Sequence, residues 1–288
     1  MAAWKNTLKT TALLGGIGGL LVLVGSLLGG AGGALIGLVL GVAIVGFTYW
    51  CSDRLAIRAA GAHEVTDQEE HDLLETVRSL ADSAEIPMPR VYVSPSPQPN
   101  AFASGRSPKK AVVCVTEGLL SSSPPAELRG VLAHEIGHIA NRDILIGSVA
   151  AAIATGISFV ANMALWAGMF GGDGEDGPPL PVLLVTALLA PIAASILQMT
   201  LSRSREFEAD RAAAELTGDP EALAQALLRL EATARRVPVE VSQAQASAYI
   251  VNPLTGRQMR FAALFQTHPA TEERVARLRA FTRSAAMT

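Results

Sequence analysis

The sequence has few of the residues on which soluble proteins and cysteine-based sites depend. Only 17% of its 288 residues are charged and 5% are aromatic, whereas 50% are hydrophobic. The two cysteines, Cys51 and Cys114, form no Cys-x-x-Cys pair, so we expect reduced thiols and no cysteine-ligated metal. The net charge is −3, and neither a basic run nor a Gly-x-x-x-x-Gly-Lys-Ser/Thr motif occurs, which argues against nucleic acid and nucleotide as partners.

Charge is also missing from long stretches of the chain. No charged residue lies between Thr11 and Trp50, although about 20 apolar residues already suffice for a helix that spans a bilayer. The glycine-rich stretch Gly29–Gly33 favours a tight turn in the middle. We therefore predict a transmembrane hairpin within residues 1–50, with helices at about 11–29 and 31–50. A cleaved signal peptide is the alternative, but its apolar region would be only about 7–15 residues long.

Two more uncharged stretches, residues 144–170 and 180–201, predict a second transmembrane pair over residues 144–201. A buried hairpin in a globular core is the alternative. The basic residues that flank all four segments lie on one side, and the loop at 171–177 is acidic. The positive-inside rule therefore predicts a multi-pass protein of the cell membrane, with both termini and the catalytic residues in the cytoplasm.

Glycine recurs every four residues from Gly25 to Gly41. Small residues at this spacing let helix backbones approach closely. Packing within the hairpin is the simpler interpretation, and a homo-oligomer formed through these glycine-rich helices is the alternative.

Residues 51–143 and 202–288 predict one cytoplasmic domain that is mainly α with a small β-sheet (α+β), formed from two separated parts of the chain. Short apolar runs predict strands at 90–93 and 111–115, joined by a turn-rich stretch. Helical periodicity, prolines and a capping box predict helices at 67–84, from 124 through 138, and at 202–217, 221–235 and 270–281. The stretch 236–266 has no clear pattern.

The string His134-Glu135-Ile136-Gly137-His138 falls on the second of these helices. Residues four apart share a helix face, so His134 and His138 can bind one metal ion. Glu135 then lies beside the metal and can accept a proton from the water that attacks the substrate. Two unrelated histidines on a solvated helix face are the alternative. Gly137 weakens the helix, which a close approach of another group to that face would explain.

A catalytic zinc usually has three protein ligands and an open position. The metzincin spacing is excluded, because it would need glycine and histidine where the chain has Asn141 and Ile144. The next donors lie in the charged cluster at 205–211, where Glu206 and Asp210 share a helix face. We predict Glu206 as the third ligand, and Asp210 as the carboxylate that accepts the free ring N–H of a metal-bound histidine. A solvated charged face is the alternative.

Several motifs together point to a family: His134–His138, the cluster at 205–210, Pro99–Gly105 and Thr267–Arg274. With two hydrophobic segments before the catalytic region and two within it, the chain resembles the membrane metallopeptidases that include the HtpX heat-shock proteases and the CAAX prenyl endopeptidases. It departs from the pattern at Ala270, where a second proline often follows the His-Pro pair.

The resemblance implies a zincin-type (gluzincin) domain with one Zn²⁺ per chain, and Glu135 as general base and acid. The implied zinc ligands are His134, His138 and Glu206.

The resemblance also implies that Asn100 lies beside an edge strand that holds the substrate backbone. It implies further that His268 and Arg274 lie near the scissile carbonyl, where they could stabilise the oxyanion. A helix cap and a surface salt bridge are the alternatives for these two residues.

The implied activity is ATP-independent cleavage of misfolded or damaged membrane proteins at the cytoplasmic face, as part of membrane quality control. Expected partners are protein substrates and the lipid bilayer. One alternative is a processing protease for a dedicated membrane or lipidated substrate. Another is a zinc-binding membrane scaffold without turnover, which Glu135 disfavours because it has no role in a structural site.

Overall fold

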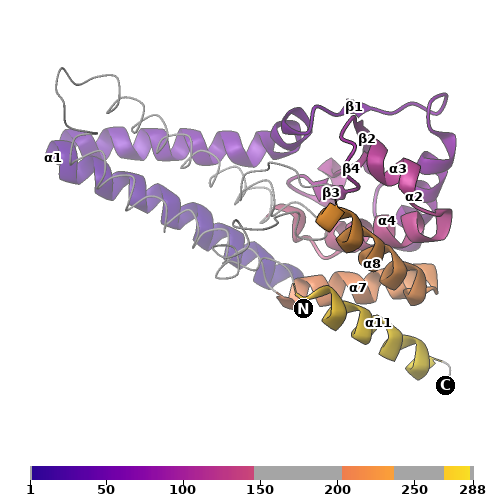
Figure 1. The fold of residues 1–288 in the computed structure, drawn as a ribbon. Coiled ribbons are helices and arrows are strands. Elements are labelled where there is room, and N and C mark those ends of the chain that lie inside the picture. The colour runs from indigo at the N-terminus through magenta and orange to yellow at the C-terminus, as the bar shows by residue number, and fades with distance from the viewer. Residues whose placement is uncertain (1, 146–202, 237–268, 286–288) are drawn as a thin grey trace, which may run out of the picture.

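The computed structural model describes residues 2–145, 203–236 and 269–285 (Figure 1). Within them the chain is mainly helical with one small mixed sheet, as predicted. The predicted membrane segments after residue 145, the stretch 237–268 and its His268 lie outside the described residues. The described elements are α1 (Ala2–Ala59), β1 (His63–Glu64), α2 (His71–Ser83), β2 (Arg90–Ser94), β3 (Ala101–Ser104), η1 (Pro108–Lys110), β4 (Val112–Thr116), α3 (Glu117–Ser122), α4 (Pro125–Ala140), α7 (Arg203–Thr217), α8 (Pro220–Arg236) and α11 (Thr271–Ala285).

Helix α1 contains the whole first hydrophobic stretch and folds back into two arms (Figure 1). Gly30, with a φ of +59°, has a left-handed conformation that glycine adopts at no steric cost, and it lies in the predicted turn. Among the described residues no single helix is long and apolar enough to cross a bilayer. Gly30–Ile44 and Tyr49–Ala59, bent by 62°, meet that criterion together. The transmembrane hairpin therefore stays a prediction.

The sheet has the strand order β1-β2-β4-β3, with β2 and β4 parallel and both outer strands antiparallel to their neighbours. β2 and β4 match the two strands predicted from the sequence. Neither β1, β3 nor the short helix α3 is evident from the sequence, because β1 has two residues and β3 lies in the turn-rich stretch. β3 begins directly after Asn100 and forms one edge of the sheet.

The helices predicted in the described residues are present, but their ends differ in two places. α11 continues to Ala285, beyond its predicted end. α2 begins at His71, four residues later than Asp67, because the capping-box residues form a turn of their own. The Glu69 carboxylate accepts hydrogen bonds from both the N–H (3.1 Å) and the hydroxyl (3.0 Å) of Thr66, so this hydroxyl donates to Glu69 instead of capping the helix.

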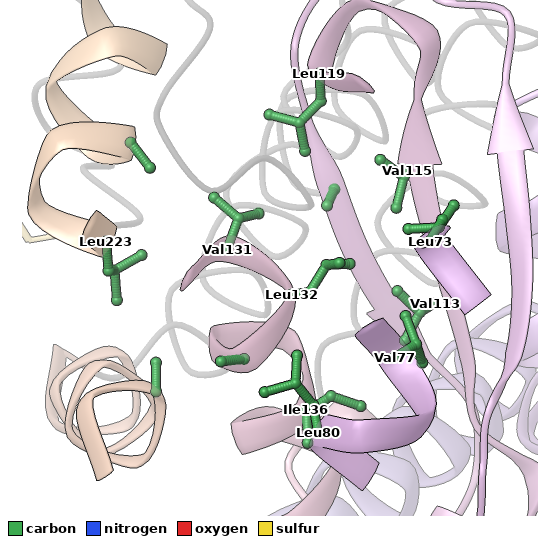
Figure 2. Packing of buried hydrophobic residues seen from close by; sticks show 14 of the residues in the cluster. Leu73, Val77, Leu80, Val113, Val115, Leu119, Val131, Leu132, Ile136 and Leu223 are labelled. Carbon is green, nitrogen blue, oxygen red and sulfur yellow. The ribbon is translucent and has the colours of Figure 1, made fainter. Parts of the chain in front are cut away.

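Helix α4 is the central helix of the domain and packs on two sides (Figure 2). Leu132 and Ile136 face α2 and Val113 of β4, whereas Val131 faces Leu223 of α8. Each of these side chains is at most 1% exposed. Burying one such side chain contributes about 1.5–3 kcal/mol. The helix that carries the histidine pair is therefore held in place by apolar contacts on two sides.

The end of α1 covers the opposite face of the sheet. Along β4, Val113 and Val115 belong to the core around α4, while Val112 and Cys114 pack with Ile57 of α1. A strand buried on both faces needs an uninterrupted apolar sequence, which β4 has. Both cysteines are free thiols, as predicted, and burial raises the pKa of Cys114 to about 12.

Candidate metal centre

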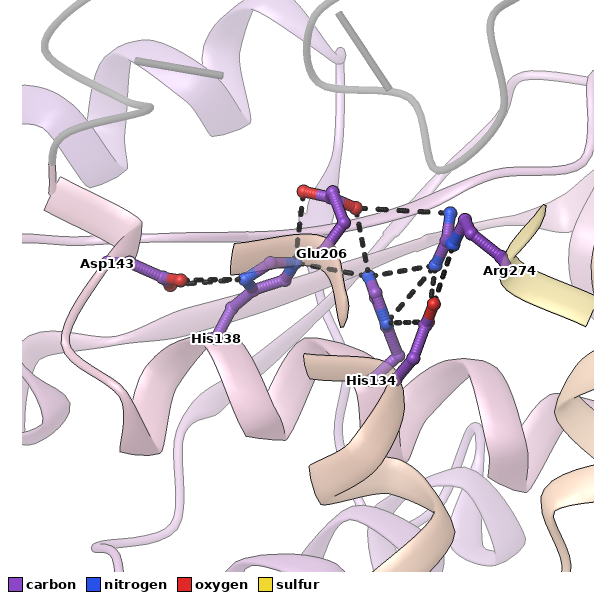
Figure 3. Close-up of polar contacts among 6 residues, drawn as sticks. His134, His138, Asp143, Glu206 and Arg274 are labelled. Carbon is purple, nitrogen blue, oxygen red and sulfur yellow. Dashed lines mark hydrogen bonds and ion pairs between the residues drawn. The ribbon is translucent and has the colours of Figure 1, made fainter. Parts of the chain in front are cut away.

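The two histidines of α4 point toward a common space (Figure 3). Their Nε2 atoms are 3.1 Å apart, and the ring planes are nearly perpendicular, at 89°. His134 is 1% exposed and His138 is partly buried. Spacing four residues apart on one helix is what brings both rings to the same face.

Glu206 reaches the same space from α7, across the contact between the two helices. Its carboxylate oxygens lie 3.6 Å from Nε2 of His134 and 3.8 Å from Nε2 of His138. One ligand atom from each of the three residues lies within 4.8 Å of the others. Two imidazoles and one carboxylate are a donor set typical of hydrolytic zinc sites, so these residues fit a divalent metal.

Gly137 allows α7 to come this close. A Cβ at this position would lie 3.1 Å from Cβ of Ala212 and 3.3 Å from the carbonyl oxygen of Ala209, both on α7. Glu206 lies one turn earlier on the same helix. The glycine that the sequence flags as unfavourable for α4 is therefore the residue that lets the carboxylate approach the histidines.

Asp210 lies one turn after Glu206 and accepts from the other nitrogen of His134, with Nδ1 and Oδ1 2.9 Å apart. Arg274 of α11 donates to both of its oxygens, from Nε at 2.8 Å and from Nη2 at 2.6 Å. Burial alone would raise the pKa of Asp210, but Arg274 and His134 hold it well below its usual range. Asp210 is therefore an anion that orients the His134 ring so that Nε2 faces Glu206.

Asp143 orients the His138 ring in the same way that Asp210 orients the His134 ring. Asp143 was not among the site residues predicted from the sequence. Both of its carboxylate oxygens lie 3.1 Å from Nδ1 of His138 (Figure 3). Burial favours the neutral ring, but this carboxylate, together with Glu206 and Glu135, outweighs burial and raises the pKa of His138 to about 10. Arg142, with a φ of +56°, turns the backbone after α4 so that Asp143 folds back. The one feature of the sequence that could have indicated Asp143 is that it is an acidic residue shortly after the end of α4.

Glu135 is 4% exposed and lies next to the ligand cluster without belonging to it. Burial raises its pKa above the ordinary value, while the two histidines act in the opposite direction. The backbone N–H of Ala103 also lowers the pKa of Glu135. Because Ala103 belongs to β3, the Glu135 side chain lies close to both the candidate metal centre and the edge strand of the sheet.

The structure describes Arg274 and Asn100, two of the three residues that the resemblance places near the substrate. Arg274 is 1% exposed, and its Nη1 lies 3.9 Å from Glu206, so its pairing is buried and is not a surface salt bridge. Its role at the substrate stays a prediction. His268 lies outside the described residues. Asn100 is buried at the start of β3, where its N–H donates to Oγ1 of Thr116 at 2.8 Å.

Replacing Gly137 by valine should separate α4 from α7. Valine needs room where even a Cβ is at 3.1 Å, so we expect about 1–3 kcal/mol of lost stability and less bound metal. Gly137→Ala should stay close to wild type, because its gain in helix propensity offsets the tighter contact. Thermal unfolding in detergent and metal analysis measure both effects. Ala140→Val, at an exposed position of α4, controls for β-branching, and an equal loss there would contradict the packing explanation.

The model of peptidase family M48 matches residues 67–282 of the chain. A protease HtpX homolog of Desulfatibacillum aliphaticivorans is 46% identical over 277 residues, which cover 95% of this chain and 89% of the relative. One from Persephonella marina is 48% identical over 279 residues, covering 95% and 96%. A crystal structure of S. mikatae Ste24p has a similar fold, with a TM-score of 0.53 and 20% identity, over 96% of this chain and 66% of that one. The chain thus belongs to peptidase family M48 and is a metalloprotease of the HtpX type.

Proposed function

We propose that this metalloprotease is a zinc endopeptidase that acts at a membrane, with the metal held by His134, His138 and Glu206. The observation that carries the proposal is the convergence of these three donors within 4.8 Å, from two helices that pack at Gly137. Three protein ligands leave a position open for substrate or water. A zinc ion bound there would polarise the scissile carbonyl and lower the pKa of a water molecule.

Glu135 is the general base and acid of the proposed reaction. Its buried carboxylate lies beside the ligand cluster, on a helix that packs against β3. From this position it would take a proton from the attacking water and return it to the leaving amine. A purely structural metal site has no use for such a carboxylate, which disfavours the scaffold alternative.

Edge strand β3 offers a place for the substrate backbone. Within the described residues β3 pairs on one side only, with β4. The backbone of Asn100 is tied to β4, because its carbonyl oxygen accepts from the N–H of Thr116 at 3.0 Å. An extended peptide could pair with the other side of β3, next to Glu135. Asn100 would then fix the beginning of the strand that binds the substrate.

The second arm of α1, from Gly30 to Ala59, supports a position in the membrane. Its large apolar side chains are unusually exposed, which is typical of a surface that contacts lipid. Those more than half exposed are Leu35, Ile36, Leu38, Val39, Leu40, Val42, Phe47 and Trp50. Gly37 and Gly41 are buried, which favours packing within the chain over an oligomer contact.

The substrates that fit this placement are membrane proteins, cleaved at the cytoplasmic face without ATP. Cleavage of misfolded or damaged membrane proteins would serve quality control of the membrane. A dedicated membrane or lipidated substrate is the alternative. Comparing membrane proteomes with and without the enzyme distinguishes a broad set of stabilised proteins from a single processed one.

Glu135→Gln should abolish turnover but leave the metal bound. Loss of a general base typically costs about 10²- to 10⁴-fold in rate, while glutamine keeps the shape of the side chain. The assay is cleavage of an unfolded protein by the detergent-purified enzyme, with metal content measured on the same sample. Glu117→Gln, on the exposed start of α3, is the matched control. Equal activity in Glu135→Gln and wild type, or activity untouched by a zinc chelator, would refute the proposed mechanism.

Asp143→Asn should weaken metal binding, because asparagine no longer offers two anionic acceptors to Nδ1 of His138. Removing such a partner of a metal-bound histidine typically costs about 10- to 100-fold in affinity. Competition with a chromogenic chelator measures the dissociation constant independently of activity. Asp82→Asn, at an exposed position of α2, is the control. An unchanged dissociation constant in Asp143→Asn would show that Asp143 does not support metal binding.

A further inference from the structure

The loop that follows edge strand β3 contacts α1 at Trp50. The guanidinium carbon of Arg106 lies 6.0 Å from the centroid of a Trp50 ring, and its Nη1 donates to the Trp50 carbonyl oxygen at 3.4 Å. Tyr49 packs edge-on against the same tryptophan, with ring centroids 5.0 Å apart. Tryptophan and tyrosine are enriched where a helix passes from lipid into water.

The side chains along α1 change character at this tryptophan. Before it, the exposed residues of the second arm are large and apolar, up to Phe47 and Trp50 at 59% and 62% exposure. After it, Arg54 and Arg58 are exposed. The order apolar, aromatic, basic along one helix is that of a segment leaving a bilayer through its headgroup layer.

Five cations lie on the two segments that meet here, since Ser104 contacts Ser52 and Val112 packs with Ile57. They are Arg54 and Arg58 of α1, Arg106 of the loop, and Lys109 and Lys110 of η1, and we refer to them as the headgroup patch.

Within the described part of the chain, no carboxylate forms an ion pair with any member of the headgroup patch. Asp53 is close in sequence, but it already pairs with Arg90 at 2.7 Å. Among the described residues, cations without an ion pair therefore follow the exposed apolar surface of α1, in a chain whose net charge is −3.

Backbone geometry holds the loop cations close to β3. Gly105 has a φ of +135°, and a Cβ there would collide with the carbonyl oxygen of Lys110, so the loop closes tightly on itself. The N–H of Lys110 donates to the carbonyl oxygen of Ser107 at 2.9 Å. Ser104, the last residue of β3, donates to the carbonyl oxygen of Ser52 at 3.4 Å. Whatever binds these cations therefore also positions the edge strand.

We propose that the headgroup patch binds anionic phospholipid headgroups and so holds β3 at the membrane surface. The inference rests on the proposed membrane position of α1, and it adds a lipid class and a binding site. Each Lys or Arg near an anionic surface strengthens binding by about fivefold. An anionic lipid bound there would place β3, the proposed substrate-binding strand, next to substrates in the membrane.

The test is native mass spectrometry of the full-length chain in detergent, with equal amounts of phosphatidylglycerol and phosphatidylcholine added. Wild type should retain phosphatidylglycerol preferentially, and added salt should reduce this preference. In Lys109→Gln/Lys110→Gln the preference should fall by at least about tenfold, because two cations are lost. Arg54→Gln/Arg58→Gln, on the other element of the patch, should give a similar fall, so that misfolding of one variant leaves the proposal testable.

The control is Arg78→Gln/Arg129→Gln, which removes two cations from α2 and α4, where Arg129 donates to Ser79. It should keep the wild-type preference. The proposal would be overturned if wild type retained both lipids equally, or if the preference for phosphatidylglycerol fell as much in the control as in the patch variants. If instead α1 did not lie in a membrane, the purified chain would stay monodisperse without detergent, which distinguishes the two outcomes.

Discussion

The site depends on one contact, the close approach of α7 to α4 at Gly137. Glu206 can reach the two histidines because position 137 has no bulky side chain, with α7 atoms about 3.1–3.4 Å from where a Cβ would be. A helix interior normally disfavours glycine by about 1 kcal/mol relative to alanine. The apolar contacts of α4 with α2, β4 and α8 offset this cost and fix the helix against which α7 packs.

Buried charge around this contact is arranged so that each histidine has its own carboxylate. Asp210 accepts from His134 and is in turn held by Arg274, whereas Asp143 accepts from His138. Both rings consequently direct Nε2 toward Glu206. A buried ion costs several kcal/mol unless it is paired, which explains why Arg274 comes from a third helix, α11, to complete the network.

The parts of the fold and site that follow from local sequence were predictable. Helical spacing located α4 and α7, and ligand chemistry linked Glu206 and Asp210 to the histidines across a long stretch of chain. Asp143 escaped prediction because its link to His138 depends on a left-handed backbone turn at Arg142, which no periodicity reveals. An edge strand beside Asn100 was expected only from the resemblance; the local pattern did not indicate β3, because its short sequence becomes a strand only by pairing with β4.

The central claim is that Glu206 completes a three-ligand zinc site with His134 and His138. Zinc content of the purified full-length chain tests it most directly, with Glu206→Gln compared with Glu208→Gln on the exposed side of the same helix. A site with these three ligands predicts about one zinc per chain for wild type and Glu208→Gln, and well below one for Glu206→Gln after dialysis against a weak chelator. A full equivalent of zinc retained by Glu206→Gln would contradict it.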